Sequence, residues 1–238
     1  MIFAVVLAGG KGSRMGNTDM PKQFLTLGTK PILIHTVEKF FVNPRFEKII
    51  VPTHKSWVSH AKNLVKKFIG DTDRIAVIDG GEARNDTIMN AIAYIDENYG
   101  LDEQTLIVTH DSVRPFVTHR IIEENIDVAL RYGAANTMVA ASDTIVESED
   151  GELVTSIPLR SRMYQGQTPQ TFKAKALRDV YTSLSPEEKE TLTDACKMLV
   201  IKGVPVRVVR GEVFNIKITY PFDLKVAQSL IEGSLAND

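Results

Sequence analysis

The sequence predicts a three-layer α/β fold with a mostly parallel sheet. Short apolar runs alternate with longer amphipathic segments over the first 141 residues, which is the pattern of repeated strand–helix units. The apolar runs are continuous rather than alternating with polar residues, so the sheet should be covered on both faces. The 238 residues show neither a repeat nor a long linker, and we expect a single domain over 1–238.

The first half of the chain supplies these units in order. Each predicted strand is a short apolar run, and each predicted helix places apolar residues on one face. Pro31 suits a first helical turn, while Gly70 and Gly133 end two later helices. The expected elements are a strand at 2–8, a helix at 31–42, a strand at 48–52, a helix at 56–69, a strand at 74–79, a helix at 85–98, a strand at 105–109, a helix at 118–132 and a strand at 136–141.

The alternation breaks after residue 141. Two short strands at 144–147 and 152–157 flank Asp150-Gly151, a dipeptide typical of hairpin turns. We expect residues 143–170 to form a projecting β-arm. Helices at 173–183 and 186–202, strands at 206–209 and 215–218, and a last helix from Pro221 should follow.

Composition excludes several classes of protein. Apolar residues make up 43% of the chain and charged residues 24%, as in ordinary globular proteins. The formal charge of −2 argues against a dedicated nucleic-acid binder. The single cysteine, Cys196, allows no internal disulfide and is expected to be a small buried residue. Without a targeting segment or an apolar run of roughly 18 residues, we expect a soluble, cytoplasmic protein that does not contact membranes.

Three loops, at 9–22, 80–86 and 110–115, carry the residues that could bind a ligand or take part in a reaction. Each follows a predicted strand, and ligands of open α/β sheets bind at the carboxyl ends of the strands. We therefore expect all three loops at one edge of the sheet.

The first loop combines glycines with the cations Lys11, Arg14 and Lys22. Glycines let backbone N–H groups approach a phosphate closely. Lys11 is followed by glycine, so the loop is not a Walker A motif, and its glycine spacing does not fit the dinucleotide fingerprint. A tight strand-to-helix turn with solvated charges is the alternative.

The other two loops leave alternatives open. In the second, Gly81 allows close approach to a base or ribose and Arg84 can neutralise phosphate, or the loop simply ends in a helix cap at Asn85 or Asp86. In the third, Asp111 is a candidate magnesium ligand, or it pairs with Arg114. His110 is expected to be a structural hydrogen-bonding residue rather than a catalyst.

Taken together, the motifs resemble those of the cytidylyltransferases that act on polyol phosphates. The resemblance spans nearly the whole chain and implies a Rossmann-like nucleotidyltransferase fold. The motifs are Leu7-Ala8-Gly9-Gly10 with Gly12, Arg14, Met15 and Gly16, Pro21-Lys22-Gln23, Gly80-Gly81-x-x-Arg84, His110-Asp111-x-x-Arg114-Pro115, Asp143-Thr144, Thr168-Pro169-Gln170 and Asn215-x-Lys217-x-Thr219.

Two members of this family differ in their acceptor. One forms CDP-methylerythritol for isoprenoid synthesis and the other forms CDP-ribitol for teichoic acid. Met163-Tyr164 stands where the methylerythritol enzymes usually have Leu-Trp, and Asn85-Asp86-Thr87 after Arg84 fits the ribitol branch better. The expected reaction is cytidylyl transfer from CTP to D-ribitol 5-phosphate, and 2-C-methyl-D-erythritol 4-phosphate is the alternative acceptor.

The resemblance also implies roles for individual residues. Arg14 and Lys22 would stabilise the transition state, Arg160 and Lys217 would position the acceptor phosphate with Thr144, and Asp111 would help to hold Mg²⁺. It further implies a homodimer whose arms complete the partner's site, and a ribitol-phosphate-forming reductase as a candidate partner. The nucleotide would be bound by Leu7, Ala8, Gly9, Gly10, Gly81, Glu82, Ala83, Arg84, Asn85, Asp86, Thr87 and Ser112.

Two other classes fit less well. A nicotinamide dehydrogenase needs a better glycine fingerprint and an acidic residue at the end of the second strand, which instead ends at Val51-Pro52-Thr53. A silent nucleotide sensor should lose the reactive-centre cations, yet Arg14, Lys22 and Lys217 are all present.

Overall fold

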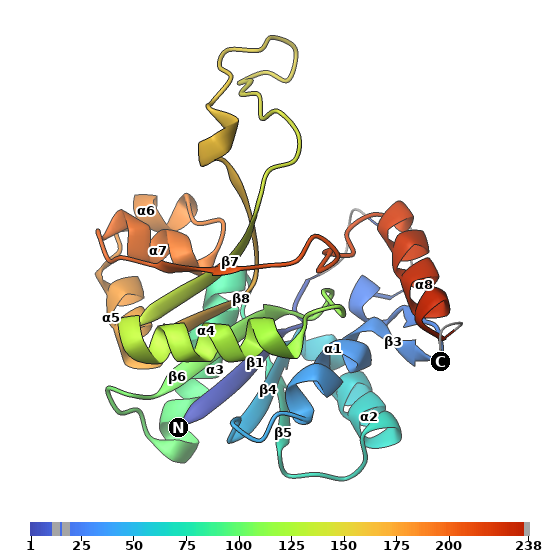
Figure 1. The fold of residues 1–238 in the computed structure, drawn as a ribbon. Coiled ribbons are helices and arrows are strands. Elements are labelled where there is room, and N and C mark those ends of the chain that lie inside the picture. The colour runs from blue at the N-terminus through green and yellow to red at the C-terminus, as the bar shows by residue number, and fades with distance from the viewer. Residues whose placement is uncertain (11–14, 16–19, 236–238) are drawn as a thin grey trace.

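A computed structural model describes residues 1–10, 15 and 20–235, and it confirms the predicted α/β class (Figure 1). Within this part of the chain, seven strands form one sheet in the order β5-β4-β1-β6-β8-β7-β9. Every neighbouring pair is parallel except those that involve β8, which runs antiparallel to β6 and β7. The strands are β1 (Ile2–Leu7), β4 (Lys48–Thr53), β5 (Ile75–Asp79), β6 (Leu106–Asp111), β7 (Ala134–Ala140), β8 (Tyr164–Lys173) and β9 (Arg207–Arg210).

Helices cover both faces of the sheet, as the continuous apolar strands predicted. One face carries α1 (Ile32–Phe41), α2 (Val58–Phe68) and α4 (His119–Tyr132). The other carries α3 (Arg84–Tyr99), α5 (Ala174–Ser183) and α7 (Ala195–Ile201).

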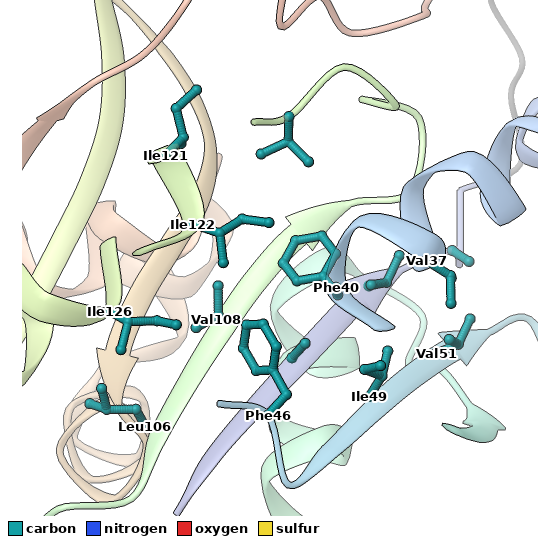
Figure 2. Packing of buried hydrophobic residues seen from close by; sticks show 14 of the residues in the cluster. Val37, Phe40, Phe46, Ile49, Val51, Leu106, Val108, Ile121, Ile122 and Ile126 are labelled. Atoms are coloured by element: carbon teal, nitrogen blue, oxygen red, sulfur yellow. The ribbon is translucent and has the colours of Figure 1, made fainter. Parts of the chain in front are cut away.

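Strand β1 shows how the two halves of the core are divided. Ala4 and Val6 belong to the cluster under α1 and α4, whereas Phe3 and Val5 belong to the cluster under α3. This is the alternation expected of a strand between two helical layers. Figure 2 shows the first cluster, where side chains of α1, β4, β6 and α4 interlock; each fully buried side chain of this size contributes about 1.5–3 kcal/mol.

A smaller layer lies beside the main sheet. The short strands β2 (Thr26–Leu27) and β3 (Lys30–Pro31) form an antiparallel pair that the sequence did not predict. Helix α8 (Pro221–Leu235) packs near this pair through a third apolar cluster that includes Leu27, Ile218 and Ala227. The predicted start of the last helix at Pro221 is confirmed.

Several predicted elements are wrong or incomplete. Residues 215–218 form no strand in the structure, and the helix expected at 186–202 divides into α6 (Pro186–Glu190) and α7. Asp194 starts the second of these helices, because its Oδ1 accepts the backbone N–H of Lys197 at 2.9 Å. Strand β8 was not predicted at all.

The chain between β7 and β8 leaves the sheet as a long projection, coloured yellow in Figure 1. The two strands expected inside it, at 144–147 and 152–157, are reduced to one isolated bridge between Glu147 and Ser156. We call residues 141–163 the arm. Its base carries the short helix η4 (Arg160–Arg162).

The helices give no sign of a membrane span. In the part of the chain that the structure describes, each helix is too short or too polar to cross a bilayer.

Candidate active site

A cleft of about 1020 Å³ lies at the carboxyl ends of β1, β4, β5 and β6. The predicted meeting of three loops at one sheet edge is confirmed, because each of them contributes to its walls. The described residues that line it are Leu7, Gly9, Gly10, Lys22, Gln23, His54, Lys55, Asp79, Gly80, Gly81, Glu82, Ala83, Arg84, Thr87, Asp111, Ser112, Val113 and Lys217.

The loop after β1 is held by Gln23. Its Nε2 donates to the carbonyl oxygens of Ala8 at 2.6 Å and Gly10 at 3.0 Å, so the backbone that leaves the sheet is fixed from the helix η2 (Lys22–Phe24). Lys22 is buried and lines the cleft. Lys11 and Arg14, expected beside it, lie outside the described residues.

The loop before α3 requires glycine. A Cβ atom on Gly81 would lie 2.4 Å from the Cβ of Asp86, so no other residue fits without a shift of the backbone. Thr87 Oγ1 accepts the N–H of Gly81 at 3.0 Å, and the N–H of Gly80 donates to the Thr53 carbonyl at 2.7 Å. These bonds fix the loop against β4 with its backbone at the cleft wall.

Helix α3 begins earlier in the structure than the sequence predicted. The cap residue is Ala83, not Asn85 or Asp86, and Asp86 Oδ2 accepts its N–H at 3.2 Å. The other oxygen of Asp86 accepts the hydroxyl of Tyr181 at 2.7 Å, a bond that raises the pKa of Tyr181 to about 12. Ala8, Asn85 and Asp86 do not line the cleft, although their neighbours do.

Three cations converge on Asp111 at the end of β6. Its carboxylate lies 3.2 Å from Arg84 Nη2, 3.0 Å from Lys217 Nζ and 3.4 Å from Arg114 Nε. Burial alone would raise the pKa of the Asp111 carboxyl, but Arg84, Lys217 and Arg114 outweigh it and hold that pKa well below its usual range. The cluster carries more positive than negative charge and faces the cleft, which suits a phosphate.

Arg84 has donor capacity left. Its Nη1 is buried and has no hydrogen-bond partner among the described protein atoms. A buried guanidinium nitrogen without a partner is costly, and an anion in the cleft would remove that cost.

Asp111 also bears on the predicted magnesium site. The expected alternative, pairing with Arg114, is present in the structure together with two further cations. No group of three His, Cys, Asp or Glu side chains gathers anywhere in the described chain. Mg²⁺ is commonly held by one or two carboxylates plus substrate phosphates, so one ionised carboxylate in a phosphate-binding cleft fits such an ion.

A buried network fixes this end of β6 from below. His110 Nε2 donates to the carbonyl of Arg114 at 3.0 Å; because a carbonyl only accepts, the other ring nitrogen, Nδ1, must accept from Thr168 Oγ1, also at 3.0 Å. Thr168 Oγ1 in turn accepts the backbone N–H of Asp111 at 3.1 Å. Burial lowers the pKa of His110 to about 4, so the ring is neutral at pH 7. The expected structural role of His110 is confirmed.

Asn215 completes the network on the far side. Its carbonyl accepts Arg114 Nη1 at 2.8 Å, and its Nδ2 donates to the carbonyl of Thr168 at 3.0 Å. These bonds, with the backbone bond from the Ile218 N–H to the Val113 carbonyl at 2.9 Å, hold residues 215–218 and place Lys217 beside Asp111. The motifs contained Thr168 and Asn215 without indicating what they do.

The arm residues stay apart from this cleft within one chain. Thr144 and Arg160 are exposed and do not line it, and Arg160 Nη1 donates to the carbonyl of Ser142 at 3.3 Å. Conversely, sequence reasoning missed His54, Lys55 and Asp79, which do line the cleft. They follow or end β4 and β5, so the rule that sites form at strand ends could have found them.

Comparison with known proteins gives one family. A model described as 2-C-methyl-D-erythritol 4-phosphate cytidylyltransferase (IspD) matches residues 2–233. The chain is similar in structure to the 2-C-methyl-D-erythritol 4-phosphate cytidylyltransferase of Francisella tularensis, with 28% identity, a TM-score of 0.79 and coverage of 96% of this chain and 98% of that one. It is also similar to the 4-diphosphocytidyl-2C-methyl-D-erythritol synthase of Anaerococcus prevotii, with 25% identity, a TM-score of 0.78 and coverage of 97% and 96%.

Proposed function

Because the chain belongs to the 2-C-methyl-D-erythritol 4-phosphate cytidylyltransferase family, it is a CTP-dependent cytidylyltransferase, and we propose that its acceptor is D-ribitol 5-phosphate. In this reaction a phosphate oxygen of the acceptor bonds to the α-phosphorus of CTP. The bond from that phosphorus to the bridging oxygen breaks, and pyrophosphate leaves with the electron pair. The product is CDP-ribitol.

The observation that carries the proposed reaction between two phosphorylated substrates is the cation cluster on Asp111. Two anionic substrates must meet, and negative charge grows around the α-phosphate as the bond forms. Catalysis of this kind depends on positioning and charge stabilisation rather than on a protein nucleophile. Arg84 and Lys217 already face the cleft at 3.2 and 3.0 Å from one carboxylate, held at the correct edge of the sheet.

Each predicted role then has a place in the reaction. Lys22 and Arg14 stabilise the charge on the α-phosphate, and Lys217 orients the acceptor phosphate. The backbone of Leu7–Gly10, the loop 81–87 and Ser112 hold the nucleotide. Asp111 would hold Mg²⁺ together with nucleotide phosphates, and the ion would supply further neutralisation of phosphate charge.

The arm completes the site in this proposal, but from a second copy of the chain. Thr144 and Arg160 are exposed on a projection with little contact to its own domain. A homodimer that exchanges arms would bring Arg160 to the acceptor in the partner's cleft. A reductase that forms ribitol phosphate is a candidate further partner, which co-purification would test.

The acceptor is the finer part of the proposal. Met163-Tyr164 at the start of β8 and Asn85-Asp86-Thr87 in α3 support the ribitol branch. A second candidate is 2-C-methyl-D-erythritol 4-phosphate, which the family model and the similar structures favour by their names.

One assay separates the two acceptors. Pyrophosphate release is measured with CTP and saturating amounts of each polyol phosphate in turn, and the CDP-polyol is identified by mass spectrometry. We expect kcat/KM to be higher with D-ribitol 5-phosphate. A higher value with 2-C-methyl-D-erythritol 4-phosphate would replace the first acceptor by the second, and turnover with neither would reject both.

A further inference from the structure

The loop before α3 rests on the side chain of Asp86. A Cβ atom on Gly81 would overlap this side chain, so the loop backbone and Asp86 are in direct contact. Asp86 Oδ2 accepts the N–H of Ala83 at 3.2 Å, and the next residue in the chain is Arg84, which reaches Asp111. The position of one carboxylate therefore bears on the backbone at the cleft wall and on one of its cations.

Asp86 is itself held from a distant part of the chain. Its other oxygen, Oδ1, accepts the hydroxyl of Tyr181 at 2.7 Å, across 95 positions of sequence. Tyr181 lies near the end of α5 and packs against the apolar cluster under α3, and it is not a residue of the cleft wall. Because the two oxygens of Asp86 have different partners, this carboxylate links α5 to the loop.

The ring of Tyr181 has contacts that do not involve its hydroxyl. Lys189 Nζ, on α6, lies 4.5 Å from the ring centroid, which is a cation–π contact. The hydroxyl stays protonated at neutral pH, because the bond to Asp86 raises the pKa of Tyr181 to about 12. Hydrogen bonds to ionised carboxylates are roughly twice as strong as those between neutral groups. The hydroxyl is therefore a constant donor on a ring that other contacts hold in place.

We propose that Tyr181 is a positioning residue for nucleotide binding: its hydroxyl holds Asp86, and Asp86 holds the loop 81–84 in the conformation that receives CTP. The inference rests on the proposed placement of the nucleotide at the loop 81–87. The apparent affinity for a ligand falls in proportion to the fraction of molecules in the conformation that binds it. Loss of the hydroxyl therefore acts through CTP affinity, although Tyr181 lies outside the cleft wall and outside every sequence motif.

The test measures CTP binding to the whole protein by isothermal titration calorimetry, with Mg²⁺ and without any acceptor. Tyr181→Phe removes the hydroxyl but keeps the ring and its contact with Lys189. Asp86→Ala removes the acceptor of that hydroxyl. Tyr132→Phe is the matched control, because this tyrosine on α4 also stacks against a cation, with Arg207 Cζ 4.6 Å from its ring centroid.

We expect Tyr181→Phe to weaken CTP binding about tenfold, the size of one hydrogen bond to a charged group, and Tyr132→Phe to bind as the wild type does. Asp86→Ala should weaken binding at least as much as Tyr181→Phe. In the Asp86→Ala background, Tyr181→Phe should change nothing further, because the hydroxyl has already lost its partner. Amide hydrogen exchange of the free Tyr181→Phe protein should rise in residues 80–87 and stay unchanged in β1.

A merely structural tyrosine would give a different result, since its loss would lower the free energy of unfolding and leave the CTP affinity intact. That outcome, an equal loss of affinity in Tyr132→Phe, or independent effects of Tyr181→Phe and Asp86→Ala would overturn the inference.

Arg84→Ala separates this inference from the proposed function. If Arg84→Ala weakens CTP binding and Tyr181→Phe does not, only the role of Tyr181 is rejected. If Arg84→Ala leaves the affinity unchanged, the proposed placement of the nucleotide is rejected, and the inference with it. Because no acceptor is present, none of these results depends on which polyol phosphate the enzyme uses.

Discussion

The cleft and the arm are built in opposite ways. At the cleft, Asp111, His110 and Thr168 are all less than 8% exposed and bonded to one another, so the chain itself fixes their positions. On the arm, Leu153 and Ile157 are 70% and 63% exposed, and beyond the base the two legs meet at the isolated bridge between Glu147 and Ser156. At the tip, Asp150 Oδ1 accepts the N–H groups of Glu152 and Leu153, and Ser148 Oγ accepts the N–H of Gly151. The difference indicates that the described walls of the cleft are fixed by contacts within the chain, whereas the arm has few contacts that hold its position.

The largest expected effect comes from removing a cation of the cleft. Lys217→Ala removes the cation 3.0 Å from Asp111 and should lower kcat/KM by at least about 10²-fold, as for other lost electrostatic donors. The measurement is pyrophosphate release. Lys225→Ala, an exposed lysine on α8, is the control and should behave as wild type. Near-native turnover in folded Lys217→Ala protein would remove this residue from the site.

The next largest effect tests whether the arm of one chain completes the cleft of another. Lys22→Ala and Arg160→Ala proteins should each be almost inactive. After mixing in equal amounts, half of the dimers are mixed and each of these has one intact site, so about a quarter of wild-type activity should return. Mass spectrometry of the native dimers confirms that subunits have exchanged.

The control for this mixture is Arg160→Ala combined with the double variant Lys22→Ala/Arg160→Ala. No arm in it carries Arg160, so activity should stay absent. If exchange occurs and the first mixture also stays inactive, the arm does not complete a partner's site.

A smaller effect tests the network under the cleft. Thr168→Val leaves the Asp111 N–H without its acceptor and His110 Nδ1 without its donor, and should lower the free energy of unfolding by about 1–3 kcal/mol. Thr168→Ser keeps the hydroxyl and should cost far less. Denaturant melts of both variants measure the difference, and an equal loss in Thr168→Ser would show that the hydroxyl contributes no more to stability than the methyl group.

The smallest effect concerns the arm alone. Val154 is 59% exposed, so Val154→Ser should change the free energy of unfolding of the isolated chain by less than about 0.5 kcal/mol. The same substitution should weaken self-association, measured by sedimentation over a range of concentrations. A large loss of stability in dilute protein would mean that the arm packs on its own domain.

Sequence reasoning succeeded where local pattern and position agree. Residues 2–8 and 118–132 were predicted from apolar runs and periodicity, and the structure has β1 and α4 there, the latter capped by Thr118. The cleft was located because strand ends of a parallel sheet share one edge. The comparison with the family confirms the cytidylyltransferase chemistry, while the acceptor remains a prediction.

Strand β8 could not be predicted because its stability comes from distant partners. Its sequence lacks alternation, and its ladder with β7 is interrupted where Gln167, Thr168 and Pro169 stand opposite Thr137 alone. Such a bulge re-aims side chains, here setting Thr168 under Asp111. The opposite error at 215–218 has the same origin, since an apolar alternation there is held by side-chain bonds and a single backbone bond to Val113 rather than by a strand ladder.

Strand β8 also connects the arm to the cleft, and this connection constrains how many residues can lie between them. It begins at Tyr164, paired with Ala140 at the base of the arm, and four residues later it reaches Thr168 beneath the cleft. Because neighbouring residues of a strand face opposite sides, one inserted residue between these points would turn Thr168 away from Asp111 or displace the arm. The turn at 148–152 carries no such constraint. Insertions and deletions that arise during evolution of this chain should therefore survive at the end of the arm and be eliminated at its root.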